Sequence, residues 1–271
     1  MPSRSARASK VAGKPLYSTR INHVGALLPD TKMMLAEWDL FADVSGNLER
    51  MRAENVFAKT SRSRIPEMLQ TFRERYLDDP DTLAALVTLV REGVSDAVLR
   101  PILFVLAARL DPLLRDTVTE FLAPLLALGR STIRTEELEV WLRAQVEAGR
   151  AQRPWSDATI RRLARGLLST LRDFGIVQGK AQKRLAPVYL PPAAFAFIAF
   201  WLQRTQRSGD KLFHDPTWHL FFLSQTGVEQ LFLEAHQERL LEYHAAGRVI
   251  RVEFPAASLK EYAHALARRA H

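Results

Sequence analysis

The pattern of apolar and polar residues predicts a protein built mainly of helices. Apolar side chains recur at spacings of three and four, as expected of helices with one buried face. The segments with this pattern are residues 30–40, 46–55, 62–77, 81–91, 96–109, 112–128, 135–148, 157–174, 192–206, 216–223, 227–246 and 258–269. Because Pro101 and Pro124 lie inside two of these segments, we expect a kink or a break at each proline.

Helix-start signals support several of these segments. Asp111 and Asp215 each precede a proline, which places a capping carboxylate ahead of the residue type favoured at the first helical position. Residues Thr226 to Glu229 and Ser258 to Glu261 fit the capping box, in which two side chains satisfy free backbone N–H groups reciprocally. These signals predict where four of the helices begin.

Only three short segments have a pattern typical of β-strands. They are Ile176–Gln178, Leu185–Leu190 and Arg248–Phe254. Pro187 suits an edge position, and Gly247 is a candidate helix C-cap. The segments 135–190 and 216–254 share one layout, because each has a helix pair, then a glycine, then a short β segment.

The chain length and the loop signals predict two folded domains. The chain has 271 residues and is 47% hydrophobic, enough to bury one large core or two ordinary ones. A glycine and small polar residues separate two long apolar runs at 129–132, where we place the boundary. We therefore expect a flexible basic tail at 1–20, an N-terminal helical domain at 21–130 and a C-terminal helical domain at 131–271.

The positive charge is concentrated in two places. Residues 1–29 hold five cations and no acid, and residues 150–184 hold nine cations against two acids. The total net charge is +8, so the rest of the chain is net negative. A cluster of cations is what a polyanion site requires, because each cation that neutralises a phosphate releases condensed counterions.

The stretch TIRRLARGLLSTLRDFG, residues 159–175, predicts a helix with one apolar and one cationic face. Its apolar stripe is wide enough to pack against a core, and Ser156 or Asp157 can cap its start. The stripe consists of Ile160, Leu163, Ala164, Leu167, Leu168, Leu171 and Phe174. Arg161, Arg165 and Arg172 fall on the opposite side, with Arg162 beside them.

The segment that follows completes a pattern typical of DNA-binding domains. The preceding helix at 135–148, this helix, and a basic hairpin at 176–190 give the order of a winged helix, in which the second helix enters the major groove. In this interpretation Lys180, Lys183 and Arg184 lie at the hairpin tip and contact phosphates. The candidate DNA-binding residues are Arg153, Arg161, Arg162, Arg165, Arg172, Lys180, Lys183 and Arg184.

The alternative to DNA binding is an ordinary solvent-exposed helix surface, whose arginines pair with acidic residues elsewhere in the protein. Only Asp157 and Asp173 are local partners, which favours nucleic-acid contact. A second basic cluster, residues 50–75, is diluted by glutamates and is typical of helix-surface ion pairs. We treat Lys59, Arg62 and Arg64 within it as auxiliary DNA contacts.

Motifs of catalysis and cofactor binding are not found in the sequence. It has no glycine-rich phosphate loop, no GxSxG, no HExxH and no cysteine. His214, Asp215 and His219 could be drawn as a metal site, but a helix cap with two histidines is the more ordinary interpretation. We therefore expect no catalytic residue, no metal and no cofactor.

The apolar runs of the sequence indicate where in the cell the protein is located. The longest, at 191–202, contains too few residues after its prolines to span a bilayer, which needs ~20. The N-terminus lacks the apolar segment of a secretory signal, and the absence of cysteine suits a reducing compartment. We expect a cytoplasmic protein without a membrane span.

Four stretches together resemble the BrxA family of the BREX phage-defence systems. They are INHVGALLPDTKMMLAEW, AENVFAKTSRSRIPEMLQTFRERYL, STLRDFGIVQGKAQKRLAPVYLP and EYHAAGRVIRVEFP, so the resemblance runs from Tyr17 to Pro255. It implies a helical protein with winged-helix-like units that binds double-stranded DNA, without known enzymatic activity, in a multi-protein defence locus. Some members have been labelled inner-membrane proteins, and the apolar run at 191–202 argues against that label here. The family carries no catalytic residue over to this chain.

We therefore expect a non-enzymatic protein that binds double-stranded DNA mainly through the phosphate backbone. Other BREX proteins are possible partners, and the oligomeric state stays open. Two alternatives remain. One is an RNA-binding helical protein, and the other is a scaffold that recruits defence proteins and uses its basic residues to dock on an acidic surface.

Overall fold

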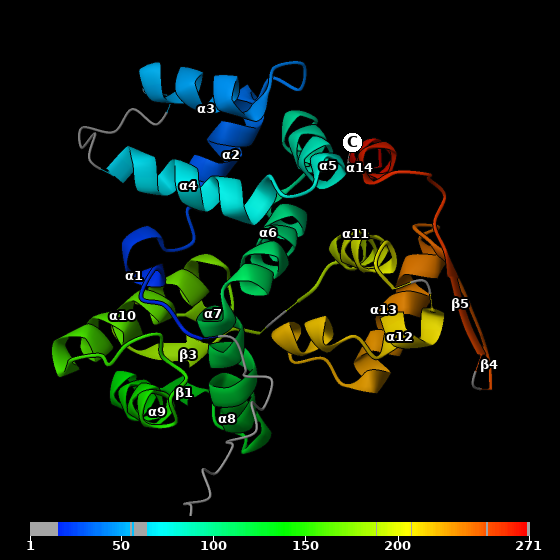
Figure 1. Ribbon diagram of the computed structural model, residues 1–271. Helices are drawn as coiled ribbons and strands as arrows, with labels where there is room; N and C mark the ends of the chain where they lie inside the picture. The colour runs from blue at the N-terminus through cyan, green and yellow to red at the C-terminus, as the bar shows by residue number, and fades with distance from the viewer. Residues whose placement is uncertain are drawn as a thin grey trace, which may run out of the picture.

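The computed structural model describes residues 16–54, 56, 64–187, 189–206, 208–247 and 249–269 (Figure 1). The fold is mainly helical, as predicted. The helices are α1 (Ile21–Val24), α2 (Leu28–Glu37), α3 (Val44–Ala53), α4 (Ile65–Tyr76), α5 (Pro80–Arg91), α6 (Asp96–Leu110), α7 (Pro112–Asp116), the π-helix η2 (Thr117–Leu122), α8 (Ala123–Ala127), α9 (Thr135–Glu147), α10 (Asp157–Asp173), α11 (Pro192–Gln203), α12 (Gly209–Phe213), the 3₁₀-helix η3 (Pro216–Phe221), α13 (Gln225–Gln237) and α14 (Leu259–Ala267). The strands are β1 (Thr132–Ile133), β2 (Val177–Gln178), β3 (Lys183–Leu185), β4 (Glu242–Ala246) and β5 (Val249–Glu253).

The strands form two small antiparallel sheets, each next to one of the later helices. The first sheet has the order β1-β3-β2, with Thr132 opposite Arg184 and Gln178 on the other side of Arg184. The second is the hairpin β4-β5, with Tyr243 opposite Val252. The elements α7, η2 and α8 follow one another without a gap. If they are counted as one helix, the element order from α7 to β3 is helix, strand, helix, helix, strand, strand.

Helix α6 is apolar almost all round and lies at the centre of the molecule (Figure 1). It runs without a break through Pro101, so the break allowed for at that proline does not occur. Pro124 behaves differently, because it follows the π-helix η2 and stands in the first turn of α8. There the helix changes type next to the residue that lacks a backbone N–H.

Two of the predicted helix starts are confirmed by side-chain caps. Asp111 accepts a hydrogen bond from the backbone N–H of Leu114 at 3.1 Å, and Asp215 accepts one from Thr217 at 2.8 Å. A third holds in part, since Ser258 accepts from the backbone of Glu261 at 3.2 Å while the Glu261 carboxylate accepts from Ala257 instead of Ser258.

The predicted capping box at Thr226 is wrong. Helix α13 begins two residues earlier, where Ser224 accepts a hydrogen bond from the backbone N–H of Gly227 at 3.2 Å. The continuous helix predicted over 227–246 is also wrong, because α13 ends at Gln237. Arg239 adopts the left-handed conformation (φ 56°), and the Leu240 N–H closes the helix on the Ala235 carbonyl at 2.8 Å.

The chain beyond this helix end pairs as a hairpin, which corrects two further expectations. Residues 242–246 form β4, so Gly247 (φ 60°) is a hairpin residue and not a helix C-cap. The strand predicted at 185–190 is also shifted. The observed strand, β3, is shorter and covers residues 183–185. Its last ladder bond joins the Ala186 N–H to the Ile176 carbonyl at 3.0 Å, and Pro187 has no N–H to continue the ladder.

Several short elements carry too little pattern to be predicted. They are α1, α12 and β1. The segment 216–223 is a 3₁₀-helix over its first six residues and not an α-helix. Elements of two to six residues span at most one or two helical turns, so their periodicity cannot be read from the sequence.

The last helix packs far from its neighbours in sequence. Helix α14 lies against α5 (Figure 1), and the Asp81 carboxylate of α5 accepts hydrogen bonds from the first backbone N–H groups of α14, 3.1 Å from Leu259 and 3.4 Å from Lys260. His264 of α14 also contacts Glu92. The predicted boundary at 129–132 stays a prediction, and α14 ties the C-terminal part of the chain to the N-terminal helices.

Residues 16–20, the described part of the predicted flexible basic tail, are packed against the protein. Tyr17 is fully buried, and Arg20 forms an ion pair with Glu74 of α4. Residues 16–20 therefore belong to the packed protein, and Arg4, Arg7, Lys10 and Lys14 lie outside the described residues. Among the residues that the structure describes, every helix is too short or too polar to cross a bilayer.

Candidate nucleic-acid interface

Helix α10 is the central element of the candidate interface. Ser156 caps its start by accepting a hydrogen bond from the backbone N–H of Thr159 at 3.3 Å. The predicted apolar stripe is buried throughout, from Ile160 near the start to Phe174 after the last turn. Burial of this stripe fixes which side of the helix faces water.

Three arginines of α10 lie on the exposed side. Arg161, Arg162 and Arg165 are all exposed, and no described residue forms a hydrogen bond or an ion pair with their guanidinium groups. Three arginines within two turns of one helix, with no partner among the described residues, concentrate positive charge at the surface. Such a surface attracts a polyanion at long range and contacts it at short range.

The two acids that could neutralise this face are engaged elsewhere. Asp157 accepts hydrogen bonds from Arg143 of α9, at 2.9 and 3.1 Å. Asp173 pairs with Arg172 at 3.2 Å, and Arg172 also donates to the Ser169 hydroxyl. Arg172 is therefore partly neutralised, in contrast to the three arginines before it.

The hairpin carries its cations in a different arrangement from the one predicted. Only Lys180 lies in the exposed loop between β2 and β3, whereas Lys183 and Arg184 lie in β3 itself. The Lys183 ammonium folds back onto the Gly179 carbonyl at 3.2 Å, and Arg184 donates to the Gln182 amide oxygen at 2.9 Å. The shorter strand accounts for this difference, because it starts two residues before the predicted one.

The connection between α9 and α10 holds one exposed arginine and one that is only partly exposed. Arg153 is exposed, and no described residue forms an ion pair with it. Arg150 is only 12% exposed and pairs with Asp116 and Glu120. The cation count of residues 150–184 includes Arg150, so the charge available at the surface is smaller than the sequence suggests.

Arg150 belongs to a buried cluster that sequence reasoning missed. The Tyr17 hydroxyl donates to Asp116 at 2.8 Å, and the Arg150 guanidinium lies 4.6 Å from the centre of the Tyr17 ring. Burial and the Asp116 carboxylate raise the pKa of Tyr17, which keeps the phenol protonated as a donor. The partners are 99 and 34 residues apart from Asp116 in sequence, so no local pattern could reveal them.

The auxiliary basic cluster does not form a second free face within the described residues. Arg50 pairs with Glu54 at 3.3 Å, as the helix-surface interpretation predicts. Arg75 is buried and donates to the backbone carbonyl oxygens of Gly25 and Ala26. Arg64 is exposed and directly precedes α4, while Lys59 and Arg62 lie outside the described residues.

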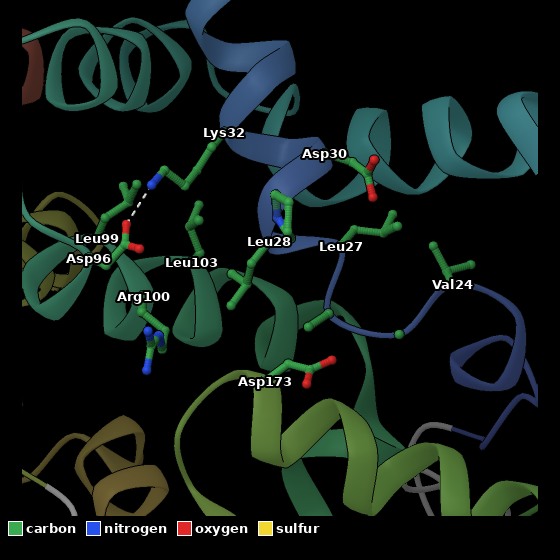
Figure 2. Close-up of a pocket in the computed structure, with 13 residues that line it drawn as sticks. Val24, Leu27, Leu28, Asp30, Lys32, Asp96, Leu99, Arg100, Leu103 and Asp173 are labelled. Atoms are coloured by element: carbon green, nitrogen blue, oxygen red, sulfur yellow. Dashed lines mark hydrogen bonds and ion pairs between the residues drawn. The ribbon is translucent and has the colours of Figure 1, made fainter. Parts of the chain in front are cut away.

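A pocket of about 750 Å³ lies at the C-terminal end of α10 (Figure 2). Its walls combine apolar side chains, such as Leu28 and Leu103, with charges of both signs. Lys32 pairs with Asp96 at 2.6 Å, and Asp173 borders the pocket at the end of α10. The mixed charge does not favour a polyanion, so this pocket is separate in character from the arginine face.

Two of the three residues that could be drawn as a metal site, His214 and Asp215, have other hydrogen-bond partners. The Asp215 carboxylate caps η3 and accepts a hydrogen bond from Gln206, and His214 Nδ1 lies 2.9 Å from the Asp210 carbonyl oxygen. Within the described part of the chain, no group of three or more histidine, aspartate and glutamate side chains could hold a metal ion.

Together these features define a mainly helical protein in which one helix face beside a small sheet carries three arginines without a partner in the described part of the chain. The BrxA family model matches residues 15–200, which is more than half of the chain. The chain therefore belongs to the BrxA family, and this membership associates it with the BREX phage-defence systems. The stretch EYHAAGRVIRVEFP, used above for the resemblance, lies beyond the matched residues.

One solved structure supports the fold. A crystal structure of an uncharacterized protein from Magnetospirillum magneticum is similar, with a TM-score of 0.57 and 19% sequence identity, over 70% of this chain and 95% of that chain. This similarity concerns the fold alone. No curated protein matches the sequence.

Proposed function

We propose that this protein is a non-catalytic component of a BREX system that binds double-stranded DNA mainly through the phosphate backbone. The observation that carries the proposal is the exposed face of α10, where Arg161, Arg162 and Arg165 have no partner among the described residues. Membership of the BrxA family supports the setting in phage defence.

The arrangement around α10 supports a winged-helix mode of binding. With α7, η2 and α8 counted as one helix, the order from α7 to β3 is helix, strand, helix, helix, strand, strand, with β3 in the middle of the sheet. This order is similar to that of a winged-helix domain and supports the proposal. In this assignment α10 is the recognition helix in the major groove, and the β2-β3 hairpin with Lys180 reaches a neighbouring phosphate track.

The composition of the face favours weak sequence specificity. Its exposed positions offer no asparagine or glutamine for bidentate contact with adenine, whereas the three guanidinium groups can contact phosphates or guanine edges. We expect affinity to depend more on salt than on base sequence.

The test is a titration of duplex DNA at several salt concentrations with the triple variant Arg161→Ala, Arg162→Ala, Arg165→Ala. If each arginine contacts one phosphate, the slope of log affinity against log salt falls by about 2.7, or ~0.9 for each contact. The control is the triple variant Glu229→Ala, Gln230→Ala, Glu234→Ala on α13, which should bind as the parent does. An arginine variant with the parent's affinity and slope contradicts the proposal. Competition by RNA of equal length separates DNA binding from RNA binding.

A scaffold role is a second candidate, favoured by exposed apolar side chains in the C-terminal region. Leu233 of α13 is 45% exposed and Val249 of β5 is 70% exposed. A complex with another BREX protein that survives nuclease treatment would support this role. In that case the variant Leu233→Ala, Val249→Ala, and not the α10 variant, should weaken the complex.

A further inference from the structure

The pocket at the C-terminal end of α10 lies between separate parts of the chain (Figure 2). The segment before α2, the first turns of α2 and the N-terminal half of α6 form most of its walls, and Asp173 borders it on the side of α10. Its volume of about 750 Å³ is within the range of roughly 300–1,000 Å³ that is typical of sites for small organic molecules. The pocket is therefore large enough to hold a ligand.

The walls of the pocket are mainly apolar. Leu27 and Leu28 lie at the start of α2 and are only partly buried. Val24, Leu99 and Leu103 are buried and line the pocket from α1 and α6. The two leucines of α2 leave apolar surface in contact with water, and covering that surface favours a ligand with an apolar body.

The backbone of the same wall has an unusual conformation. Leu27 has φ 53° and ψ 27°, the left-handed region that residues other than glycine rarely occupy. It is one of three such residues in the described part of the chain. Backbone of this kind costs free energy and is found preferentially at ligand sites, where the surrounding structure holds it in place. This second feature is independent of the volume and points to the same wall.

Most of the charged side chains around the pocket already have partners. Lys32 pairs with Asp96 at 2.6 Å, and Asp173 pairs with Arg172 at 3.2 Å. Asp30 is buried and also has an interaction partner. These groups therefore do not require a counter-charge from a ligand.

Arg100 of α6 differs from the other charged residues of the pocket. Within the described part of the chain, no residue forms a hydrogen bond or an ion pair with its guanidinium group. Figure 2 shows its side chain directed away from Lys32, and a Cβ at Gly175 would lie 3.4 Å from its Nη1 atom. A guanidinium beside apolar walls suits a carboxylate, because its N–H groups form two parallel hydrogen bonds with the two oxygens.

We propose that this pocket binds a small molecule that carries one carboxylate on an apolar body. Arg100 holds the carboxylate, and the leucines of α2 and α6 cover the apolar body. A free organic acid and the C-terminus of a short apolar peptide both have this chemistry. Because the pocket is separate from the arginine face of α10, binding of this ligand does not depend on the proposed binding of DNA.

The first test measures binding of octanoate to the full chain by ligand-observed NMR, which detects weak binding. Octanoate should bind. Octylamine, a cation with an apolar chain of the same length, and acetate, which lacks the apolar body, should not. Absence of octanoate binding, or equal binding of octylamine, overturns the proposal.

A competition experiment separates the two sources of the carboxylate. Acetylated trileucine with a free C-terminus is added to the complex with octanoate, and acetylated trileucine amide is the control. Displacement by the free acid alone assigns the pocket to peptide ends as well as organic acids, and no displacement by either assigns it to organic acids. Equal displacement by the amide would mean that the carboxylate is not recognised, which overturns the proposal.

The second test removes the cation. Arg100→Gln should weaken octanoate binding about tenfold or more, because hydrogen bonds to a charged group are lost. Arg100 is exposed, so the change leaves the core intact. The matched control, Arg109→Gln, removes the same charge from an exposed position near the other end of α6 and should bind octanoate as the parent does. Equal octanoate affinity of the two variants overturns the proposal.

The third test places the ligand in the pocket. The chain contains no cysteine, so Leu28→Cys introduces a single thiol in the pocket wall. Octanoate should slow alkylation of this thiol several-fold and leave alkylation of the exposed Thr226→Cys variant on α13 unchanged. Octanoate that binds without protecting the thiol at position 28 lies elsewhere on the protein, and this result overturns the proposal.

Discussion

Residues 156–185 and 224–253 are two segments of equal length with the same order of elements. Each begins with a serine that caps a long helix, α10 or α13, and each ends with the second strand of a hairpin. A shift of 68 positions aligns their capping serines, and the same shift aligns Gly179 with Gly247 in the two hairpins. The comparison shows which residues the shared order of elements requires and which residues a DNA-binding surface requires.

The buried positions of the two helices correspond over their first three turns. Ile160 and Leu163 of α10 align with Val228 and Leu231 of α13, and all four are buried. Further along, Leu167 aligns with the buried Ala235. Helical packing demands apolar residues at these positions, so the two segments agree there.

The exposed positions differ in charge. Arg161, Arg162 and Arg165 of α10 align with Glu229, Gln230 and Leu233 of α13, and every one of these residues is exposed. Over the whole segments, 156–185 has a net charge of +5 and 224–253 has a net charge of −2. Element order alone therefore does not make a phosphate-binding surface, and only the first segment has the charge for one.

The largest expected effect comes from exchanging these exposed residues. In the variant Arg161→Glu, Arg162→Gln, Arg165→Leu, α10 carries the residues of α13, and we expect the affinity for duplex DNA at 0.1 M salt to fall on the order of a thousandfold. Fluorescence anisotropy with a labelled duplex measures the change.

The reciprocal variant, Glu229→Arg, Gln230→Arg, Leu233→Arg, sharpens the same comparison. If charge on the exposed face is the deciding factor, this variant should gain affinity and show a steeper salt dependence than the parent. Binding that stays unchanged in both variants would mean that the arginine face of α10 does not contact DNA.

The hairpin glycines should differ in a smaller but measurable way. Gly179 has φ 89°, and a Cβ there would lie 2.0 Å from the Gln182 carbonyl oxygen. Gly247 has φ 60° and open space around it. Gly179→Ala should cost about 3 kcal/mol, whereas Gly247→Ala should cost about 1 kcal/mol. Urea unfolding of the two variants tests this, and equal costs would show that crowding at Gly179 is relieved by a small shift of the loop.

The smallest expected effect is on stability, and it concerns an ion pair between the end of α11 and the start of α5. Helix α11 precedes the second segment. Arg204 pairs with Asp79. Burial opposes ionisation of Asp79, but the hydrogen bonds from Arg204 and Thr82 outweigh it and lower the pKa of Asp79 to about 2. Because the folded pKa lies below the unfolded value, the contribution of this pair is complete above about pH 4 and is lost as the pH falls through about 2.

Arg204→Gln removes the partner and tests this attachment. Both side chains are one-third exposed, so the loss of stability at pH 7 should be below about 1 kcal/mol. The difference between parent and variant should shrink as urea unfolding is repeated from pH 5 down to pH 2.5. A difference that stays constant over this range would mean that Arg204 stabilises the protein through packing and not through its charge.

Periodicity was a good guide to the long helices and a poor one to helix ends and short elements. The stripe of α10 is buried as predicted, because a helix of seventeen residues repeats its pattern several times. The predicted helix over 227–246 fails because the apolar residues Leu240, Leu241 and Tyr243 continue the pattern after the chain has turned at Arg239. The local sequence therefore does not show whether an apolar pattern continues as a helix or passes into a turn and a strand.

The amino-acid order alone determines the mainly helical fold, the buried side of α10 and the cationic character of its other side, because these depend on neighbours within a few residues. Tertiary structure decides which cations stay available. It places Asp116 and Glu120 against Arg150, Glu74 against Arg20, and Arg143 against Asp157, while Arg161, Arg162 and Arg165 keep no partner among the described residues. An ion pair requires its two groups to lie within about 4 Å, and for partners tens of residues apart only the folded chain sets that distance.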